Sequence, residues 1–393
     1  MIAAVILGAL FFMSPVQASP NITAPMAVVM CFDTGDILYE RNMHDRWIPA
    51  SMTKSLTAFI VYEEIEAGNL ALDTRLRVSA NAARFSQDRR AEGSFVPLRE
   101  GAYITVEMLL RLTMLPSANA ACVVFAEHIS GSEAAFVERM NQTAYDLGMY
   151  TSFNNSHGAI AHHSDAYSSA VLVREFISRF PDILRITRMA YVDFDGTRYN
   201  NTNRLLPGRT MPVTGVDGFK TGSLRAAGWN HSVTAIRDGR RIIAVVMGTV
   251  NVDAAMRDSR TLIEFGFEEL ARVEAAHAAR VRVFHNGQLV PMTTPVIVEG
   301  NRMLMPLYAI FRPLGFDLAW DGTARVATAE HTRHGRSTAT AGNVRANVRG
   351  NIVHLPVAPR VVEGRVFVPV EFVEAVTSTT MAWCRTTGVV NFR

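Results

Sequence analysis

Two residues in the stretch SMTK, Ser51 and Lys54, are of types that could perform nucleophilic catalysis. A serine hydroxyl is a weak nucleophile until a base removes its proton, and a lysine whose pKa is lowered by burial or by another cation can be that base. Apolar residues follow at helical spacing, so the two side chains are expected on one face of a helix start. The backbone N–H groups there suit the negative charge that develops on an attacked carbonyl oxygen.

Lysine is rare in this chain. Among 39 lysines and arginines, only Lys54 and Lys220 are lysine. Arginine keeps its proton at any ordinary pH, whereas a buried lysine can act as a base. Codon bias with two chance survivors explains the scarcity equally well when it is taken alone. The residues around the two lysines therefore decide between the two interpretations.

The second lysine lies in DGFKTGS, residues 217–223, which has the pattern of a β-strand. The glycines of this stretch allow another backbone to approach closely. Lys220, Thr221 and the main chain offer a cation, a hydroxyl and hydrogen-bonding groups to an extended peptide that ends in a carboxylate. Between the two lysines, the predicted loop 115–119 carries Ser117 and Asn119, which could relay a proton and bind a substrate amide.

SMTK, SAN and KTG, in this order, resemble the three motifs of the penicillin-binding and serine β-lactamase superfamily. Longer stretches are similar to one branch of it, the low-molecular-mass D-alanyl-D-alanine carboxypeptidases of the S11 peptidase type. These stretches are IPASMTKSLTA, LLRLTMLPSANAAC, NTNRLL and VDGFKTG. Both lysines stand where the family has its catalytic and substrate-binding lysines, which favours function over chance.

The resemblance implies a catalytic role for Ser51 as the acyl-forming nucleophile, for Lys54 as its general base and for Ser117 in proton transfer. It implies substrate binding by a second set of residues: Asn119, Lys220, Thr221, Gly222 and Ser223. Asn119 would hold the substrate's amide, and Lys220 with Thr221 would meet the terminal carboxylate. The N–H groups of Ser51 and Ser223 would form the oxyanion hole.

One position departs from the family pattern. The family commonly carries an aromatic residue or histidine and then threonine after the glycine of KTG, whereas this chain has Ser223-Leu224. The backbone oxyanion donor is unaffected by this change. The hydroxyl contact that the threonine supplies is lost.

The implied function is an exported serine carboxypeptidase that removes the terminal D-alanine from peptidoglycan stem peptides and is trapped covalently by β-lactams. It needs no cofactor, and nucleic acid is not an expected partner. A class A β-lactamase is the rival enzyme, but it needs a deacylating glutamate between SAN and KTG. Glu175, in a helical pattern, is the only glutamate between residues 151 and 219. A catalytically idle wall-binding protein is the third alternative, which the intact motifs disfavour.

A histidine-rich stretch, NNSHGAIAHHSD, could suggest a metal site. It brings His157, His162, His163 and Asp165 close together in the chain. It contains no H-E-x-x-H pattern and no cysteine partner, which are the usual signatures of zinc sites. We therefore predict no metal site.

The elements that must position the motif residues form an α+β pattern. Residues 27–41 read as a β-hairpin, about 105–180 as helices, 216–250 as a β-meander and about 254–274 as a closing helix. Thr105 and Ser164 stand where helix N-caps are expected. The order predicts one antiparallel sheet with an inserted helical region, and the resemblance implies a β-lactamase/transpeptidase-like domain over residues 19–278.

Residues 281–393 form a second predicted domain, which is rich in short β-like runs. Residues 295–320 repeat as 359–383, with Pro306 and Trp320 recurring at Pro369 and Trp383, and each copy reads as strand, Glu-Gly turn, strand, short helix, strand. This part resembles the copper amine oxidase N-terminal-like domain, a name that implies no copper site here. It contains 12 arginines and 7 acidic residues, a net charge of +5, which leaves −2 for the rest of the +3 chain. A cell wall or surface partner is the expected ligand.

The N-terminus, residues 1–18, has the apolar run and small-residue cleavage site of a secretory signal peptide. We therefore expect an extracytoplasmic, wall-associated protein. The three cysteines, Cys31, Cys122 and Cys384, are too few and too scattered for a disulfide framework. Each lies in an apolar setting, which predicts buried thiols.

Overall fold

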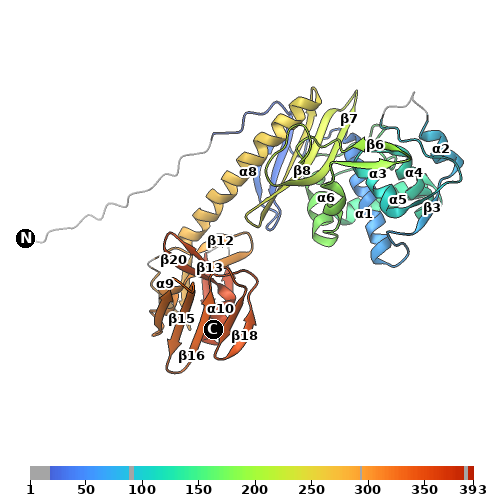
Figure 1. Cartoon of the computed structure of the whole chain (residues 1–393). Coiled ribbons are helices and arrows are strands. Elements are labelled where there is room, and N and C mark those ends of the chain that lie inside the picture. The colour runs from blue at the N-terminus through green and yellow to red at the C-terminus, as the bar shows by residue number, and fades with distance from the viewer. Residues whose placement is uncertain (1–17, 88–92, 293, 385–387) are drawn as a thin grey trace, which may run out of the picture.

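The computed structural model describes residues 18–87, 93–292, 294–384 and 388–393, so nearly all of the predicted signal peptide lies outside the described residues. The chain forms two units joined by one long helix (Figure 1). The first unit combines a sheet with a group of helices, and the second is rich in strands. The expected α+β architecture with a small β-rich domain after it is confirmed.

A five-stranded antiparallel sheet is the centre of the first unit, with the strand order β2-β1-β9-β8-β7. Its strands come from both ends of the unit, as the sequence predicts. They are β1 (Met26–Cys31), β2 (Ile37–Arg41), β7 (Val216–Leu224), β8 (Gly228–Arg237) and β9 (Arg240–Thr249).

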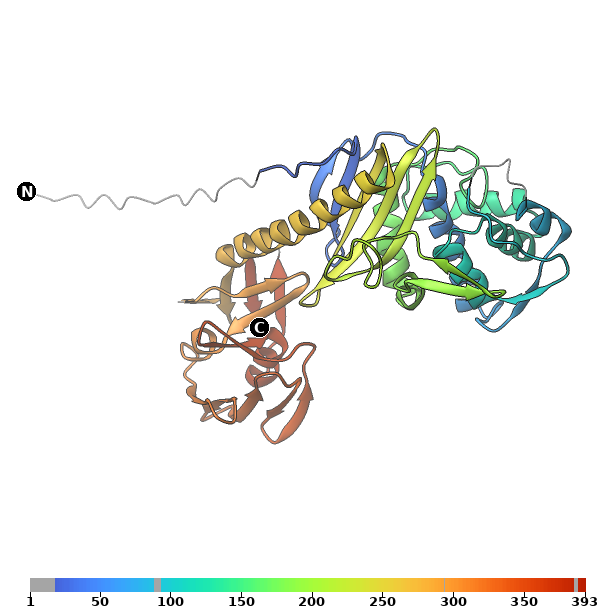
Figure 2. The same cartoon turned by 45° about the horizontal axis from the view of Figure 1, so that its top comes forward.

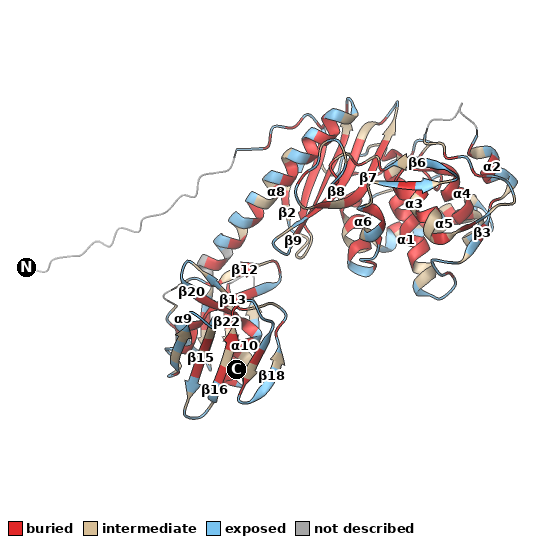
Figure 3. Ribbon diagram, viewed as in Figure 1, coloured by how far each residue is buried: buried red, intermediate tan, exposed pale blue. Residues whose placement is uncertain are grey.

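Both faces of this sheet are buried (Figure 3), because the residues of β1 and residues 242–247 of β9 are all apolar and do not alternate with polar ones. Val28 and Met30 point to one side, into a core shared with the inserted helices. Val29 and Cys31 point to the other side, into a core shared with the long helix. The sheet is thus a rigid support for the residues at its β7 edge.

The helical region lies between β2 and β7 in the chain and packs on one sheet face (Figure 1). Thr105 caps its third helix as predicted, with its side chain accepting from the Met108 N–H. The prediction of Ser164 as a cap is wrong by one residue, since Asp165 caps α6. The helices are α1 (Lys54–Glu66), α2 (Ala80–Phe85), α3 (Val106–Met114), α4 (Asn119–Ser130), α5 (Glu133–Asp146), α6 (Ala166–Arg179) and α7 (Ile183–Thr187). Short β-pairs accompany them: β3 (Arg75–Arg77) with β4 (Tyr103–Thr105), and β5 (Tyr191–Phe194) with β6 (Thr197–Asn200).

The closing helix, α8 (Val252–Arg280), is longer than predicted and runs across the other sheet face towards the second unit (Figure 2). Its last turns belong to both units. Ala278 packs in the C-terminal core, and the Glu274 carboxylate accepts a 2.8 Å hydrogen bond from the Gly300 N–H. These contacts explain why the helix continues beyond residue 274. Within the described residues, no single helix has the length and apolarity of a membrane crossing; α4 and α5 together reach them, with an 87° bend between them.

The second unit confirms the internal repeat. Each copy consists of two strands joined at Glu-Gly, a short helix and a further strand. The first copy contains β12 (Ile297–Glu299), β13 (Arg302–Pro306), α9 (Leu307–Phe311) and β14 (Asp317–Asp321). The second contains β19 (Arg360–Val362), β20 (Arg365–Pro369), α10 (Val370–Thr377) and β21 (Met381–Cys384).

The two copies meet along β13 and β20, which pair antiparallel at the centre of one four-stranded sheet. Met305 lies opposite Val368 at this seam, and both are fully buried. Equivalent residues of the copies are therefore related by a local two-fold arrangement. The remaining strands are β10 (Arg282–His285), β11 (Gln288–Val290), β15 (Val326–His331), β16 (Gly335–Thr340), β17 (Arg345–Val348), β18 (Asn351–His354) and β22 (Val389–Phe392).

The cysteine prediction is correct at two positions and wrong at the third. Cys31 and Cys122 are buried, whereas Cys384 is exposed. Cys384 lies at the end of β21, an edge strand whose successive side chains alternate between the core and solvent. Met381 and Trp383 belong to the inward phase of this alternation, and Ala382 and Cys384 to the outward phase.

Candidate active site

Ser51 lies in a short 3₁₀ turn, η1 (Ala50–Thr53), which leads directly into α1. Side chains three residues apart eclipse one another in a 3₁₀ turn. This geometry places the Lys54 Nζ 2.9 Å from the Ser51 Oγ. Ala50, the residue before the serine, has a φ of +51°, which is strained for a residue other than glycine. The predicted pair is therefore assembled, in a tighter turn than the α-helix start expected from the sequence.

Lys54 has a fully buried side chain, 0% exposed, with three acceptors around its amine. Besides Ser51, they are the Asn119 Oδ1 at 2.7 Å and the His157 carbonyl oxygen at 2.5 Å. Burial lowers the pKa of Lys54 from 10.5 to about 8. A neutral amine has two N–H bonds and one lone pair. When Asn119 and His157 take both hydrogens, the lone pair is directed at the Ser51 hydroxyl.

The rate of acylation at Ser51 should depend on pH through this amine. Only neutral Lys54 can accept the serine proton, and with a pKa of about 8 roughly one molecule in ten is neutral at pH 7. The rate should therefore rise about tenfold per pH unit below 8 and level off above it. Stopped-flow measurement of acylation by a fluorescent penicillin across this range tests the prediction. A rate that is flat between about pH 6 and pH 9 would contradict it.

Ser117 lies in the predicted loop between α3 and α4, whereas Asn119, predicted at the end of that loop, is the first residue of α4. Ser117 has a φ of +70°, and its buried Oγ has no hydrogen-bond partner among the described residues. The Asn119 Nδ2 is likewise buried without a partner there. A buried polar group without a partner costs free energy, so these two atoms are poised for a ligand. Asn119 also fixes Lys54 through its Oδ1, a contact that the predicted substrate role did not include.

Strand β7 supplies the KTG residues at the edge of the sheet. Gly222 is required there, because a Cβ at this position would lie 2.4 Å from the Pro49 carbonyl oxygen. The strand can thus approach the nucleophile turn closely. The Thr221 Oγ1 donates to the Thr202 Oγ1 at 2.6 Å, in the stretch NTNRLL.

Lys220 is buried, 1% exposed, and its amine donates to the Thr221 carbonyl oxygen at 3.1 Å. Burial, and then the charge of Lys54, hold the pKa of Lys220 well below its usual value. The predicted contact of Lys220 with a substrate carboxylate stays a prediction, because the amine lies beneath the cleft surface in this structure.

A cleft of about 580 Å³ brings the motifs together. Five of the eight predicted residues line it, while Lys54, Asn119 and Lys220 are buried. The sequence analysis did not identify several other lining residues, among them Trp229 and Val250. The lining residues are Ser51, Gly93, Ser94, Pro116, Ser117, Thr202, Thr221, Gly222, Ser223, Leu224, Arg225, Gly228, Trp229 and Val250.

Residues 154–163, which we name the histidine loop, contact the amine of the catalytic lysine through their backbone. The His157 carbonyl oxygen accepts from Lys54, and the next residue, Gly158, has a φ of +80°. A Cβ on Gly158 would lie 2.0 Å from the Ala50 carbonyl oxygen. The Asn155 Oδ1 accepts from the N–H groups of His157 and Gly158 and fixes this bend. The sequence signal was the Asn-Ser-His-Gly turn, which we considered only for metal binding.

Two imidazoles of the histidine loop, those of His157 and His162, have partners inside the protein. The His157 Nδ1 accepts from the Ala159 N–H, and the His162 Nε2 lies 2.8 Å from the Thr53 Oγ1. Burial lowers the pKa of His157 to about 3 and that of His162 to about 4, so both rings stay neutral at ordinary pH. Over the described residues, no group of three or more histidine, cysteine or acidic side chains has an arrangement that could hold a metal ion.

Comparison with known families agrees with this geometry. Residues 13–251, more than half of the chain, match the S11 peptidase family of D-alanyl-D-alanine carboxypeptidases. The chain belongs to this family. Residues 284–392 match the copper amine oxidase N-terminal domain. Both resemblances noted in the sequence are confirmed.

Individual relatives cover the carboxypeptidase part of the chain. D-alanyl-D-alanine carboxypeptidase DacD of Escherichia coli (strain K12) is 34% identical over 264 residues, 66% of this chain and 67% of the relative. DacF of Bacillus subtilis (strain 168) is 34% identical over 257 residues, 63% of this chain and 62% of the relative. The cefotaxime-bound structure of penicillin-binding protein D2 from Listeria monocytogenes is 29% identical, with a TM-score of 0.57 over 64% of this chain and 100% of that chain.

The β-lactamase alternative finds no support in the position of the glutamates. Glu175 lies in α6, where its carboxylate is 3.3 Å from the Arg174 guanidinium, and it does not line the cleft. Glu133 accepts from the N–H and hydroxyl of Ser156 in the histidine loop, also outside the cleft lining. Among the described residues, no carboxylate lines the cleft to activate a deacylating water.

Proposed function

We propose that this protein is a serine-type carboxypeptidase that removes the terminal D-alanine from peptidoglycan stem peptides. The observation that carries the proposal is the fully buried Lys54 amine, 2.9 Å from the Ser51 hydroxyl and within a family whose named relatives are D-alanyl-D-alanine carboxypeptidases. The unpartnered Ser117 hydroxyl supports it, because Ser117 lines the cleft and a peptide bound there can supply the missing partner.

The reaction follows from the arrangement of the side chains. The Ser51 oxygen attacks the carbonyl carbon of the penultimate residue while its proton passes to the Lys54 amine. The peptide bond breaks, and a proton from Lys54, relayed by Ser117, goes to the departing D-alanine amine. Ser51 is left esterified to the shortened peptide. Water then attacks this ester, the same lysine takes the water's proton, and the serine hydroxyl is restored.

Release of D-alanine from a synthetic peptide ending in D-Ala-D-Ala tests this function. The native chain should release one D-alanine per peptide, and Ser51→Ala should release none. The same peptide ending in D-Ala-L-Ala serves as the stereochemical control. Equal release by native protein and by Ser51→Ala would show that the assigned nucleophile is wrong.

We propose further that the protein acts outside the cytoplasm and that its C-terminal domain holds it at the cell wall. The net charge of +5 in residues 281–393 supports this, since walls carry many carboxylates. Arg333, Arg336 and Arg345 are exposed, and their guanidinium groups form no ion pair with other described residues. Arg336 lies on β16 and Arg345 on β17, so the charges are held on a rigid sheet.

Neutralising these three arginines to glutamine in the full chain should reduce sedimentation with purified cell walls several-fold. The attraction is electrostatic, so the native protein should also detach as salt is added. The rate on a soluble peptide should stay unchanged, because none of the three lines the cleft. Two results would contradict a wall-binding role for the domain: unchanged sedimentation of the variant, or binding of the native protein that does not depend on salt concentration.

A further inference from the structure

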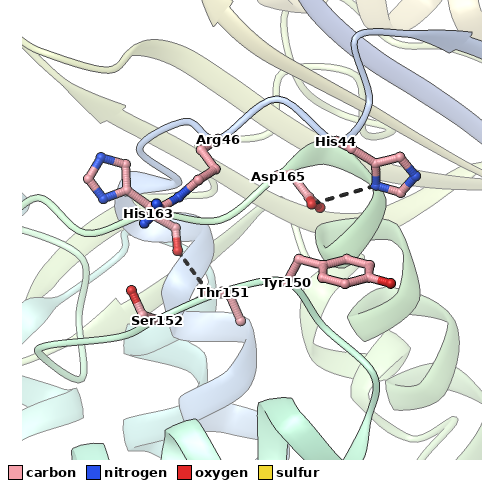
Figure 4. A pocket seen from close by; sticks show the side chains of 7 residues that line it. All are labelled: His44, Arg46, Tyr150, Thr151, Ser152, His163 and Asp165. Atoms are coloured by element: carbon pink, nitrogen blue, oxygen red, sulfur yellow. Dashed lines mark hydrogen bonds and ion pairs between the residues drawn. The ribbon is translucent and has the colours of Figure 1, made fainter.

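A second cavity, of about 420 Å³, is separate from the catalytic cleft and shares no lining residue with it (Figure 4). Three chain segments form it: the chain before the nucleophile turn, the chain after α5 and the end of the histidine loop with the start of α6. A volume of this size lies in the range of small-ligand sites. The lining residues are His44, Arg46, Tyr150, Thr151, Ser152, His163 and Asp165.

Backbone hydrogen bonds hold the walls of this cavity together. Trp47 and Ser164 exchange two N–H···O bonds of 2.8 Å each. The Ser152 N–H donates to the His163 carbonyl oxygen at 3.1 Å. The cavity is therefore preformed, and a ligand would bind without first ordering the chain.

Asp165 supplies a carboxylate with unused acceptor capacity. Its side chain is only 1% exposed, and its Oδ1 accepts from the Ser168 N–H as the cap of α6. Its Oδ2 forms no hydrogen bond with any described residue; its one charged neighbour is the half-exposed His44, whose Nδ1 lies at an ion-pair distance of 3.7 Å (Figure 4). A buried carboxylate oxygen in this state is stabilised by a cationic N–H donor. Because Asp165 lines the cavity, this oxygen is available to a ligand.

Arg46 and His163 lie together on the other side of the cavity, across from Asp165, His44 and Tyr150 (Figure 4). The Arg46 guanidinium has no ion pair or hydrogen bond within the part of the chain that the structure describes. An arginine fork suits a carboxylate, and the Ser152 hydroxyl adds a further donor. The cavity thus has a cationic side and an anionic side.

We propose that this cavity binds the head group of an α-amino acid. The ligand carboxylate would lie against Arg46 and His163, and its ammonium against Asp165. The Tyr150 ring, 69% exposed at the rim, would cover the aliphatic part of the ligand. Two sources carry this chemistry: a free amino acid, or the free amino-acid end of a diamino acid within a wall peptide.

Calorimetric titration of the full chain with D-alanine, with meso-diaminopimelate and with a tripeptide ending in that diamino acid tests the proposal. Saturable binding of at least one probe is expected, and which probes bind identifies the source. Arg46→Gln and Asp165→Asn should each weaken binding at least tenfold. Both variants should fold, because Arg46 is exposed and asparagine caps helices as well as aspartate does. Pimelate, which lacks the ammonium groups, should bind at least tenfold more weakly than the diamino acid.

A cleft variant separates this site from the catalytic one. Thr221→Val alters the cleft, and it should leave the affinity of the cavity probes unchanged. Two results would overturn the inference: no saturable binding of any probe up to about 10 mM, or binding that Thr221→Val abolishes while the two cavity variants retain it. Release of D-alanine from a peptide is measured separately, so failure of the proposed function would not be mistaken for failure of this site.

Discussion

Replacing Lys54 with arginine is expected to lower the rate of acylation at Ser51 by about 10³-fold, a loss typical of removing a general base. A guanidinium keeps its proton, so it cannot take the one that the Ser51 hydroxyl must lose. The positive charge is retained, which distinguishes loss of proton transfer from loss of charge. Trapping of a radiolabelled penicillin at several times gives the rate.

Lys220→Arg is the matched control for this substitution. Both lysines are buried, with 0% and 1% exposure, so the larger guanidinium meets a comparable steric cost at each position. The predicted role of Lys220 is to contact the substrate carboxylate through its positive charge, and it is not the base at Ser51. Lys220→Arg should therefore keep at least tenfold more acylation activity than Lys54→Arg. Equal rates in the two variants would show that the scarcity of lysine has no bearing on the chemistry.

Gly158→Ala is expected to lower acylation at least 100-fold without a change at any catalytic side chain. The new Cβ would lie 2.0 Å from the Ala50 carbonyl oxygen, beside the nucleophile, and the φ of +80° is strained for alanine. The histidine loop must shift to relieve this contact, and the His157 carbonyl then leaves the Lys54 amine. Neutral Lys54 would no longer be oriented towards Ser51, and misplacements of this kind cost about 10²-fold.

Gly148→Ala isolates the contribution of the clash. Gly148 has a φ of +70°, similar to that of Gly158, but a Cβ there would meet no atom within 4 Å. Alanine should cost about 1 kcal/mol of stability at this position and leave the acylation rate unchanged. Thermal melts and the radiolabel assay on both variants give the comparison. If Gly158→Ala acylated as fast as Gly148→Ala, the histidine loop would have no part in orienting Lys54.

The sequence predicted the features of the site that are local in the chain. Ser51 and Lys54 are three residues apart, so any helical turn brings them together, and Ser117 and Asn119 lie at the break between two periodic segments. The repeat in the C-terminal domain was equally visible, because each copy keeps its own turn, proline and tryptophan. These features depend on spacing, which a sequence shows directly.

Long-range contacts of the backbone could not be predicted in the same way. The carbonyl that accepts from Lys54 belongs to His157, 103 residues away, and every residue has a carbonyl. The Asn-Ser-His-Gly pattern indicates a turn, but it does not indicate that the turn contacts Lys54. The burial of Lys220 beneath the cleft has no sequence signal either. The length of α8 depends in the same way on the Glu274 contact with Gly300 in the second unit. The eight assigned roles and the signal peptide stay predictions until they are tested by experiment.

The most direct test of the central claim is an intact-mass measurement after incubation with benzylpenicillin. The native protein should gain the mass of one antibiotic molecule, and peptide mapping should place it on Ser51, because no carboxylate among the described residues lines the cleft to drive rapid deacylation. Ser51→Ala should gain nothing. Rapid consumption of the penicillin with no accumulated adduct would contradict the assignment and favour a β-lactamase.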